Sequence, residues 1–272
     1  MTGPENGNQT VSLLERIVRS KRREVAERKI LHPKDTMPIR PSDDHRDFAA
    51  ALSGPGISVI AELKRRSPSG GVLCDGADPA KRGQLYQKAG ADAVSVLTDG
   101  PFFGGKAEDI LEVRQICTLP ILRKDFIVDA CQIAESRALG ADAILLIVRI
   151  LSQQQLEAFL LEATDLSLAA LVEVHNAKEL DCALTAGARI VGVNNRDLDT
   201  LHIDLRTSLD LATRIPDSCI RVSESGVRTA NDVRKLADEG FNAVLVGETL
   251  MRSADPETTL RELKRGGGAS VD

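Results

Sequence analysis

Ala89-Gly-Ala-Asp-Ala-Val-Ser-Val-Leu97 is the stretch that decides the fold, because the chain repeats it. A close echo, Leu139-Gly-Ala-Asp-Ala-Ile-Leu-Leu-Ile147, follows it, and looser echoes occupy residues 186–194 and 239–247. In each copy a glycine ends a helical pattern and a short apolar run comes next, which is typical of a left-handed helix cap before a strand. The repeat therefore predicts a series of helix–turn–strand units.

The spacing of the repeat predicts how many units there are. The recurring glycines, Gly90, Gly140, Gly187 and Gly240, lie 50, 47 and 53 residues apart, which is too long for one βα unit and right for two. Apolar runs at residues 58–63, 119–122, 169–174 and 220–223 supply the intervening strands. Helical patterns separate the strands near residues 78–89, 106–117, 129–139, 152–163, 176–186, 205–214, 229–240 and 256–265.

Eight βα units with doubly buried strands predict an α/β fold, a closed (β/α)8 TIM barrel with an N-terminal helical extension. An open doubly wound sheet is the alternative, but the chain lacks a G-x-G-x-x-G turn. We expect residues 1–50 to form the extension, with an amphipathic helix over 11–29 and a proline-containing linker over 32–44. The barrel is expected over residues 51–265 and a flexible tail over residues 266–272.

The composition of the 272 residues narrows the function classes. The net charge is −5, Trp is absent and Tyr occurs once, so we expect no nucleic-acid partner. Five widely spaced cysteines without a C-x-x-C pair predict no disulfide framework and no metal site. The chain has no apolar leader or long apolar run, so we expect no membrane association and a cytoplasmic location.

Charged or amide side chains interrupt the apolar runs, mostly at their C-terminal ends. A buried charge is costly unless it is paired or used, and barrel enzymes place their sites where the strands end. One such residue would fit a structural ion pair, but the repetition favours a shared catalytic site. Its expected members are Glu62, Lys64, Lys124, Glu173, Asn194 and Glu224.

Three of these expectations concern ionisation and orientation. Lys124 suits a general acid or a Schiff-base amine, with its pKa lowered by burial beside another lysine. Glu173 lies in an apolar run, so we expect desolvation to raise its pKa and to make it a proton donor. Arg123 alternates with Lys124 and should point outward, between helices, while His175 is expected to be structural or at the rim.

Two glycine-containing turns predict a phosphate site. Ser223-Glu-Ser-Gly-Val227 and Val246-Gly-Glu-Thr-Leu250 follow the seventh and eighth predicted strands, where barrels often bind phosphate through backbone N–H groups. Ordinary tight turns would also contain glycine. The basic stretch 64–71 is either a mobile lid that attracts an anion or a solvated loop.

Together these residues resemble the indole-3-glycerol phosphate synthase family. The resemblance rests on Ile60-Ala-Glu-Leu-Lys-Arg-Arg-Ser-Pro-Ser-Gly70, Leu122-Arg-Lys-Asp-Phe-Ile-Val-Asp129, Leu171-Val-Glu-Val-His175, Gly192-Val-Asn-Asn-Arg-Asp-Leu198 and Val222-Ser-Glu-Ser-Gly-Val227. Residues 14–25 also look like the extra helix that this family carries before its barrel.

The resemblance implies a reaction that needs no cofactor or metal. The substrate would be 1-(2-carboxyphenylamino)-1-deoxyribulose 5-phosphate, which closes to an indole with loss of carbon dioxide and then water. Lys124 would be the principal general acid, Glu173 the acid for dehydration and Glu62 a candidate base. Lys64 would contact the substrate carboxylate, and Asn194 would orient hydroxyl groups with support from Glu224.

The resemblance also implies two binding regions. Substrate and phosphate contacts would come from Ser67, Arg196, Ser225, Gly226, Gly247 and Glu248. The anthranilate pocket would comprise Pro68, Phe103, Phe126, Leu145 and Leu198. Two residues depart from the family pattern: Gly105 replaces a usual serine, and Glu248 places a carboxylate beside the expected phosphate.

The expected partner is a phosphorylated small molecule, with neighbouring enzymes of tryptophan biosynthesis as further candidates. Because the chain carries one barrel, we expect a single activity. A phosphate-binding aldolase that uses Lys124 as a Schiff-base amine is the rival enzyme. A barrel that binds a phosphorylated ligand for regulation is the rival without catalysis, although the full acid–base set argues against it.

Overall fold

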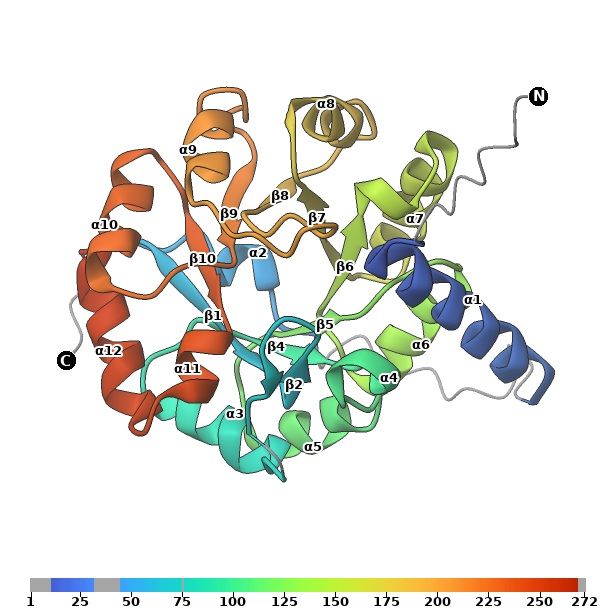
Figure 1. Ribbon diagram of the computed structural model, residues 1–272, viewed down its shortest axis with the longest axis horizontal. Coiled ribbons are helices and arrows are strands. Elements are labelled where there is room, and N and C mark those ends of the chain that lie inside the picture. The colour runs from blue at the N-terminus through green and yellow to red at the C-terminus, as the bar shows by residue number, and fades with distance from the viewer. Residues whose placement is uncertain (1–10, 32–44, 75, 269–272) are drawn as a thin grey trace, which may run out of the picture.

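The computed structural model describes residues 11–31, 45–74 and 76–268, and its centre is a closed barrel of parallel strands (Figure 1). Around the barrel the order is β1-β10-β9-β8-β7-β6-β5-β4, and β1 pairs with β4 to close the ring. The barrel strands are β1 (Ser58–Leu63), β4 (Ala93–Leu97), β5 (Ile121–Lys124), β6 (Ala143–Ile147), β7 (Ala169–Val174), β8 (Ile190–Asn194), β9 (Ile220–Glu224) and β10 (Ala243–Val246). The predicted TIM barrel is confirmed.

Helices alternate with the strands, as the repeat predicts. The helices that follow the barrel strands are α3 (Pro79–Lys88), α5 (Asp109–Ile116), α6 (Cys131–Leu139), α7 (Gln153–Asp165), α8 (Ala177–Thr185), α9 (Arg206–Ala212), α10 (Ala230–Asp238) and α12 (Pro256–Gly266). All four recurring glycines have φ angles between 81° and 94°, the left-handed conformation expected of them. This conformation lets each helix turn directly into the next strand.

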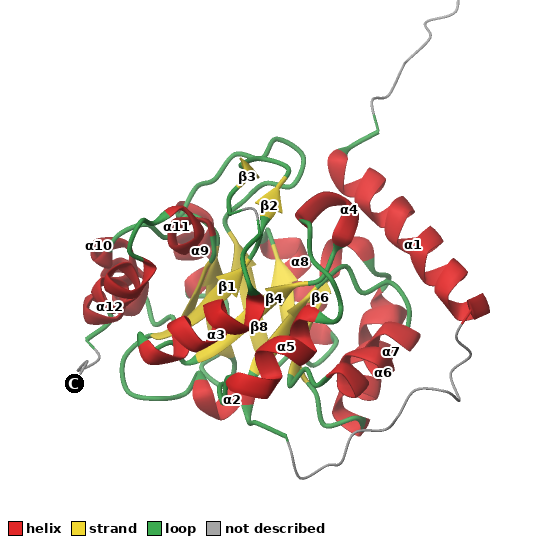
Figure 2. Cartoon of the chain, turned by 90° about the horizontal axis from the view of Figure 1, so that it is seen from below, coloured by secondary structure: helices red, strands yellow, loops and turns green. Residues whose placement is uncertain are grey.

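Several short elements were not predicted. They are the hairpin strands β2 (Arg66–Ser67) and β3 (Gly71–Val72), the helices α2 (Phe48–Ala51), α4 (Gly100–Phe103) and α11 (Glu248–Arg252), and the 3-10 turn η3 (Val148–Ile150). Figure 2 shows α2 at one end of the barrel and the β2–β3 hairpin at the other. Since the hairpin follows the C-terminal end of β1, that end of the barrel carries the loops that can form a site.

The hydrophobic core has two layers because side chains on successive strand residues point in opposite directions. One layer lies between strands and helices, and Val59, Ala61 and Val94 belong to it. The other fills the barrel interior, and Ile60 and Leu122 belong to it, together with Phe48 of α2. Strands buried on both faces explain why the runs read as continuously apolar.

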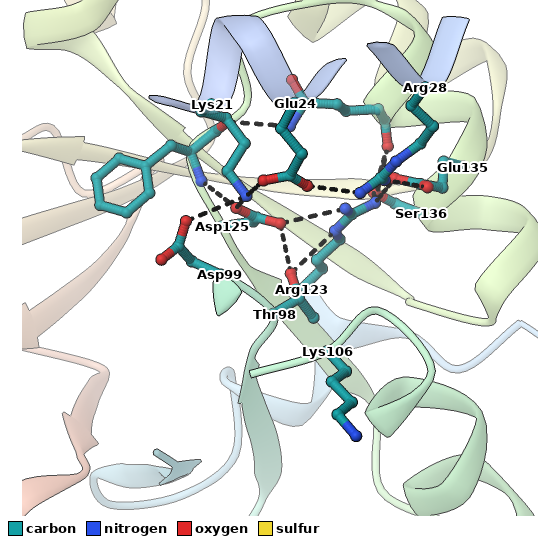
Figure 3. Close-up of polar contacts among 12 residues, drawn as sticks. Lys21, Glu24, Arg28, Thr98, Asp99, Lys106, Arg123, Asp125, Glu135 and Ser136 are labelled. Atoms are coloured by element: carbon teal, nitrogen blue, oxygen red, sulfur yellow. Dashed lines mark hydrogen bonds and ion pairs between the residues drawn. The ribbon is translucent and has the colours of Figure 1, made fainter. Parts of the chain in front are cut away.

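The N-terminal helix α1 (Leu13–Leu31) docks on the barrel through a buried charge network (Figure 3). Lys21 is 1% exposed, and its Nζ lies 3.0 Å from Asp125 Oδ1 and 3.2 Å from Asp99 Oδ2. Burial would lower the pKa of Lys21, but the charges of Asp125 and Asp99 outweigh it, and the pKa is raised. Lys21 therefore stays charged and holds the ends of two strands to the helix.

Arg123 forms the other half of this network. It points outward between β5 and α6, as predicted, and donates to Ser136 Oγ at 3.1 Å and pairs with Glu135 at 2.7 Å. It also pairs with Asp125 at 3.2 Å, so Asp125 sits between two cations. Burial acts to raise the pKa of Asp125, but Arg123 and Lys21 lower it to about 2.

Some predictions fall on residues that lie outside the described part of the chain. The linker at 32–44 is one of them, and so are residues 269–272 of the expected tail, whereas Gly266 is the last residue of α12. The division into extension, barrel and tail at residues 50 and 265 therefore stays a prediction. No helix among residues 11–31, 45–74 and 76–268 is long and apolar enough to cross a membrane.

The Lys21 network predicts a large stability difference between two lysines of one helix. Replacing Lys21 with Met removes the cation that buried Asp99 and Asp125 share, although Asp125 keeps Arg123, and removing one member of a buried pair costs about 3–5 kcal/mol. Lys29 pairs with Asp129 at 2.6 Å but is 46% exposed, so Lys29→Met should cost about 1 kcal/mol or less. Urea denaturation measures both values, and equal losses would contradict a docking role for Lys21.

Candidate active site

A cavity of about 450 Å³ opens where the barrel strands end. Every residue predicted for the site lines it, with the exceptions of Ser67 and Pro68. The predicted polar and charged residues that line it are Glu62, Lys64, Lys124, Glu173, Asn194, Arg196, Glu224, Ser225 and Glu248. The charged side chains at the strand ends therefore converge on one cavity.

Lys124 and two carboxylates form the centre of the cavity. Lys124 ends β5, and its Nζ donates to Glu173 Oε2 on β7 at 2.8 Å. The same Nζ lies 3.0 Å from Glu224 Oε2 on β9. Both glutamates are almost completely buried, with 2% and 1% exposed, so they depend on this shared cation.

The surroundings of Lys124 keep it protonated. Burial acts to lower its pKa, but the charges of Glu173, Glu224 and Glu62 outweigh burial, and the pKa is raised well above its usual value. The prediction that a neighbouring lysine would lower this pKa is wrong, because the groups within reach are carboxylates. A protonated lysine suits proton donation and does not suit attack as a free amine.

The pKa values of the two glutamates are shifted in opposite directions. Burial acts to raise the pKa of Glu173, but Lys124, His175 and a hydrogen bond from Asn194 outweigh it, so the pKa is lowered. The prediction that the pKa of Glu173 is raised is therefore wrong. Glu224 is the carboxyl whose pKa is raised, to about 7. Burial raises this pKa most, Lys124 offsets part of the effect, and repulsion from Glu173 raises the pKa further.

A second acid–base pair sits at the end of β1. Lys64 Nζ donates to Glu62 Oε1 at 2.6 Å, and the two residues share a strand face, as their spacing predicts. Two glycines make room for the buried carboxylates. A Cβ atom on Gly247 would collide with Glu62 Oε1, and one on Gly192 would collide with Glu224 Oε1. A side chain at either glycine would displace one of these carboxylates.

The turns after β9 and β10 form the glycine-containing end of the cavity. Ser225 has φ 65° and Gly226 has φ 89°, so the chain turns sharply after β9. Gly247 caps the short helix α11, whose first turn faces the cavity at Glu248 and Thr249. The two predicted glycine turns therefore lie together at one end of the cavity, and α11 has only five residues.

Glu248 is held by arginine side chains. Its Oε2 accepts from Arg196 at 3.3 Å and its Oε1 accepts from Arg252 at 3.0 Å. Burial acts to raise the pKa of Glu248, but Arg252 and Arg196 outweigh it, and the pKa is lowered. The carboxylate that departs from the family pattern is thus neutralised by two cations.

The basic stretch 64–71 is folded as the β2–β3 hairpin and is anchored on both sides of the cavity mouth. Arg196 donates to Ser69 Oγ at 2.8 Å, and Arg252 donates to the Gly70 carbonyl at 2.8 Å. On the other side Arg65 pairs with Asp109 at 2.5 Å. Ser67 accepts from the Gly70 N–H within the hairpin at 3.0 Å, and Pro68 is exposed, so these two residues do not line the cavity.

Apolar side chains form the opposite wall. The ring centroids of Phe103 and Phe126 are 6.0 Å apart, and Leu145 and Leu198 line the same cavity. Position 105, which departs from the family pattern, requires glycine in this structure, because a Cβ atom there would overlap the carbonyl oxygen of Leu97. The cavity therefore has apolar and aromatic side chains that suit a ring and polar side chains that suit an anion.

Sequence reasoning missed several lining residues. They are Leu97, Asp125, Ile147, Ile203, Val227, Arg228, Leu245, Val246, Thr249 and Arg252. Leu97, Ile147, Leu245 and Val246 belong to strands already recognised, and register would have found them, whereas Ile203 and Val227 lie in loops. Arg228 and Arg252 follow the two glycine turns, and a search for cations next to those turns would have identified both. Among the described residues no cluster of three or more His, Cys, Asp or Glu side chains is arranged to hold a metal.

The raised pKa of Glu224 predicts a pH-dependent stability cost. A carboxyl whose pKa is raised on folding stabilises the fold below its unfolded pKa and loses that contribution as pH rises through about 7. Replacing Glu224 with Gln should therefore stabilise the protein more at pH 8 than at pH 5, by about 2–3 kcal/mol. Urea denaturation at the two pH values, with exposed Glu27→Gln as the control, measures the difference. A gain independent of pH would contradict it.

Comparisons with known proteins agree with this geometry. The sequence profile described as "Indole-3-glycerol phosphate synthase" matches residues 14–263. "Indole-3-glycerol phosphate synthase 2" of Streptomyces coelicolor is 52% identical over 218 residues, which cover 80% of this chain and 84% of the relative. The "Indole-3-glycerol phosphate synthase" of Alkaliphilus metalliredigens is 44% identical over 257 residues, which cover 93% of this chain and 98% of the relative.

Solved structures support the fold at low sequence identity. 3-Hexulose-6-phosphate synthase from Salmonella typhimurium has a TM-score of 0.61 at 14% identity and covers 77% of this chain and 98% of its own. Thiamine phosphate pyrophosphorylase from Pyrococcus furiosus has a TM-score of 0.56 at 14% identity, over 78% of this chain and 95% of its own. The profile match and the relatives go further than the fold: the chain belongs to the indole-3-glycerol phosphate synthase family.

Proposed function

We propose that this chain is a carboxy-lyase that converts 1-(2-carboxyphenylamino)-1-deoxyribulose 5-phosphate to indole-3-glycerol phosphate in tryptophan biosynthesis. The observation that carries the proposal is the position of Lys124, protonated and paired with two buried glutamates, in a cavity with one aromatic wall. Family membership supports the same assignment. The partner is a phosphorylated small molecule; neighbouring pathway enzymes and a cytoplasmic location are further expectations carried by the family alone.

Binding follows from the two ends of the cavity. The anthranilate ring would lie against Phe103, Phe126, Leu145 and Leu198, since flat apolar walls favour an aromatic ring. The phosphate would lie at the turn formed by Ser225 and Gly226 and at Gly247, and these residues would donate to it through their backbone N–H groups. Arg196 lines the cavity beside Glu248 and would contact the ribulose or phosphate oxygens.

Ring closure would use Lys124 as a general acid. The ring carbon that bears the carboxylate attacks the ribulose carbonyl carbon, a C–C bond forms, and the carbonyl oxygen takes a proton from Lys124 Nζ. Glu173 and Glu224 keep that proton on Lys124 until the oxygen develops negative charge. Lys64 would hold the carboxylate before carbon dioxide leaves, and its partner Glu62 is the candidate base for the anilino nitrogen.

Dehydration would use Glu173. The hydroxyl formed by ring closure leaves as water when a protonated carboxyl donates to it, and loss of a ring proton completes the indole. Asn194 would orient the substrate hydroxyls and keep Glu173 in place, with Glu224 in support. Glu173 is ionised while Lys124 is charged, so it can act as an acid only after Lys124 has given up its proton.

The function is tested by indole fluorescence on adding the carboxyphenylamino substrate, and the absence of Trp leaves the signal clear. Replacing Lys124 with Ala should lower turnover by about 10²–10⁴-fold, the usual contribution of a positioned general acid. The exposed Lys178→Ala is the matched control and should keep full activity. Folded wild-type protein that forms no indole would reject the assignment. Borohydride trapping of substrate on Lys124 would instead favour the aldolase.

The position of Glu248 predicts a gain in affinity. Glu248→Gln removes the charge that occupies Arg196 and Arg252, so both guanidinium groups become available to the anionic substrate. KM should fall about threefold, the scale of one exposed ion pair, while kcat stays unchanged. Glu257→Gln, which removes the similar pair with Arg261 on α12, is the control. A higher KM for Glu248→Gln would show that this carboxylate assists binding.

A further inference from the structure

His175 stands directly behind Glu173 and outside the cavity lining. It follows β7, its side chain is 8% exposed, and its Nε2 lies 3.4 Å from Glu173 Oε1. Within the described residues this Nε2 is buried and makes no hydrogen bond that meets normal geometry. The other carboxylate oxygen of Glu173 already accepts from Lys124 at 2.8 Å, so Glu173 lies between two possible proton donors.

Glu179 fixes the orientation of the imidazole ring. Its Oε2 accepts from the His175 backbone N–H at 2.8 Å and lies 3.0 Å from His175 Nδ1. Its Oε1 accepts from the Asn176 side chain at 2.8 Å, and Asn176 caps α8 in return. A carboxylate at Nδ1 keeps a proton on that nitrogen, so Nε2, which faces Glu173, is the nitrogen that gains or loses one.

The proposed reaction has a proton requirement that Lys124 alone does not meet. Ring closure delivers one proton to the carbonyl oxygen, and dehydration delivers a second to the departing hydroxyl. Formation of the indole double bond returns one proton, which recharges only one of the two donors. The balance agrees with the charges, since a carboxylate leaves as neutral carbon dioxide. Each turnover therefore draws one proton from water, and Glu173 needs a source for it.

We propose that His175 is a positioning residue that acts through Glu173 and supplies the proton for dehydration. In this step, which rests on the function proposed above, the Nε2–H bond of the imidazolium breaks and an O–H bond forms on Glu173 Oε1. Glu173 then passes the proton to the hydroxyl, the C–O bond breaks and water leaves. The neutral imidazole takes up one proton from solvent before the next turnover. His175 does not touch the substrate at any stage.

The charges around His175 support this sequence. Burial acts to lower its pKa, but the hydrogen bond to Glu179 and the charges of Glu173, Glu179 and Glu224 outweigh burial, and the pKa is raised. Lys124 pairs with Glu173, and Arg149 on the neighbouring η3 pairs with Asp199. When Lys124 loses its proton, Glu173 loses a stabilising charge and its proton affinity rises, so transfer from His175 becomes favourable at that point.

A single-turnover experiment separates this role from a structural one. In His175→Gln, release of carbon dioxide should stay within about threefold of wild type, whereas indole formation should slow by about tenfold or more, the lower range for loss of a proton donor. His202→Gln, an exposed histidine outside the cavity, is the matched control. Equal slowing of both products in His175→Gln would overturn the proposal. Wild-type protein that forms no indole would overturn the proposed function instead.

The pH profile provides a second and independent test. In wild type the rate of the indole-forming step should fall as pH rises through the raised pKa of His175, because the imidazolium is lost. Glu179→Gln keeps an acceptor for Nδ1–H but removes a charge that raises this pKa, so the fall should move to lower pH. An unchanged profile in Glu179→Gln would overturn the proposal. If His175→Gln does not fold, this variant decides the question alone.

Discussion

The charge of Lys124 is the constraint around which the C-terminal end of the barrel is arranged. Two buried glutamates share it, and neither could remain ionised in that place without a cation. Room for the Glu224 carboxylate comes from Gly192 on the neighbouring β8, and room for Glu62 comes from Gly247 after β10, because neither glycine has a side chain to occupy the space. Chemistry and fold are therefore coupled at these positions, because a bulkier residue would change the packing and the ionisation together.

Three consecutive residues at the end of β5 belong to two separate charge networks, one outside the barrel and one in the cavity. Arg123 points outward to α6, Lys124 points into the cavity, and Asp125 joins Arg123 to Lys21 of α1. Strand alternation makes this division possible, since neighbouring side chains face opposite ways. The outer network holds its charges in fixed pairs, whereas the inner one leaves Glu224 titrating near neutrality. A site that must move protons differs in this way from a site that only holds two elements together.

The barrel and most of the cavity could be predicted from the sequence because their signals are periodic. The repeat at Gly90 and Gly140 marks helix–strand junctions, and strand-end charges such as Glu62 and Glu224 converge once eight strands close. The directions of the pKa shifts at Lys124 and Glu173 could not be predicted in the same way. They depend on which charged side chains of other strands lie close by, and this cannot be read from the order of residues along the chain.

Residues that act across long sequence separations were also difficult to predict. Lys21 reads as one of many charges on an amphipathic helix, and only its contacts with Asp99 and Asp125 distinguish it. Arg252 reads as an ordinary residue at the end of a helix, although it contacts the carbonyl of Gly70. His175 belongs to no metal-binding sequence motif. Its proposed role depends on its contact with Glu179, four residues later in the chain.

The closure of the barrel has a consequence for the order in which the chain folds. β1 pairs with β4 on one side but with β10 on the other, where Ser58 lies opposite Ala243. During synthesis, β1 must therefore wait for almost the whole chain before its second edge is covered, and contacts this far apart in sequence slow folding. The helix α1 precedes the barrel in the chain, and its buried lysine finds Asp125 only after β5 has been made. The strand β1 is thus made before the other barrel strands but is among the last to have both edges paired.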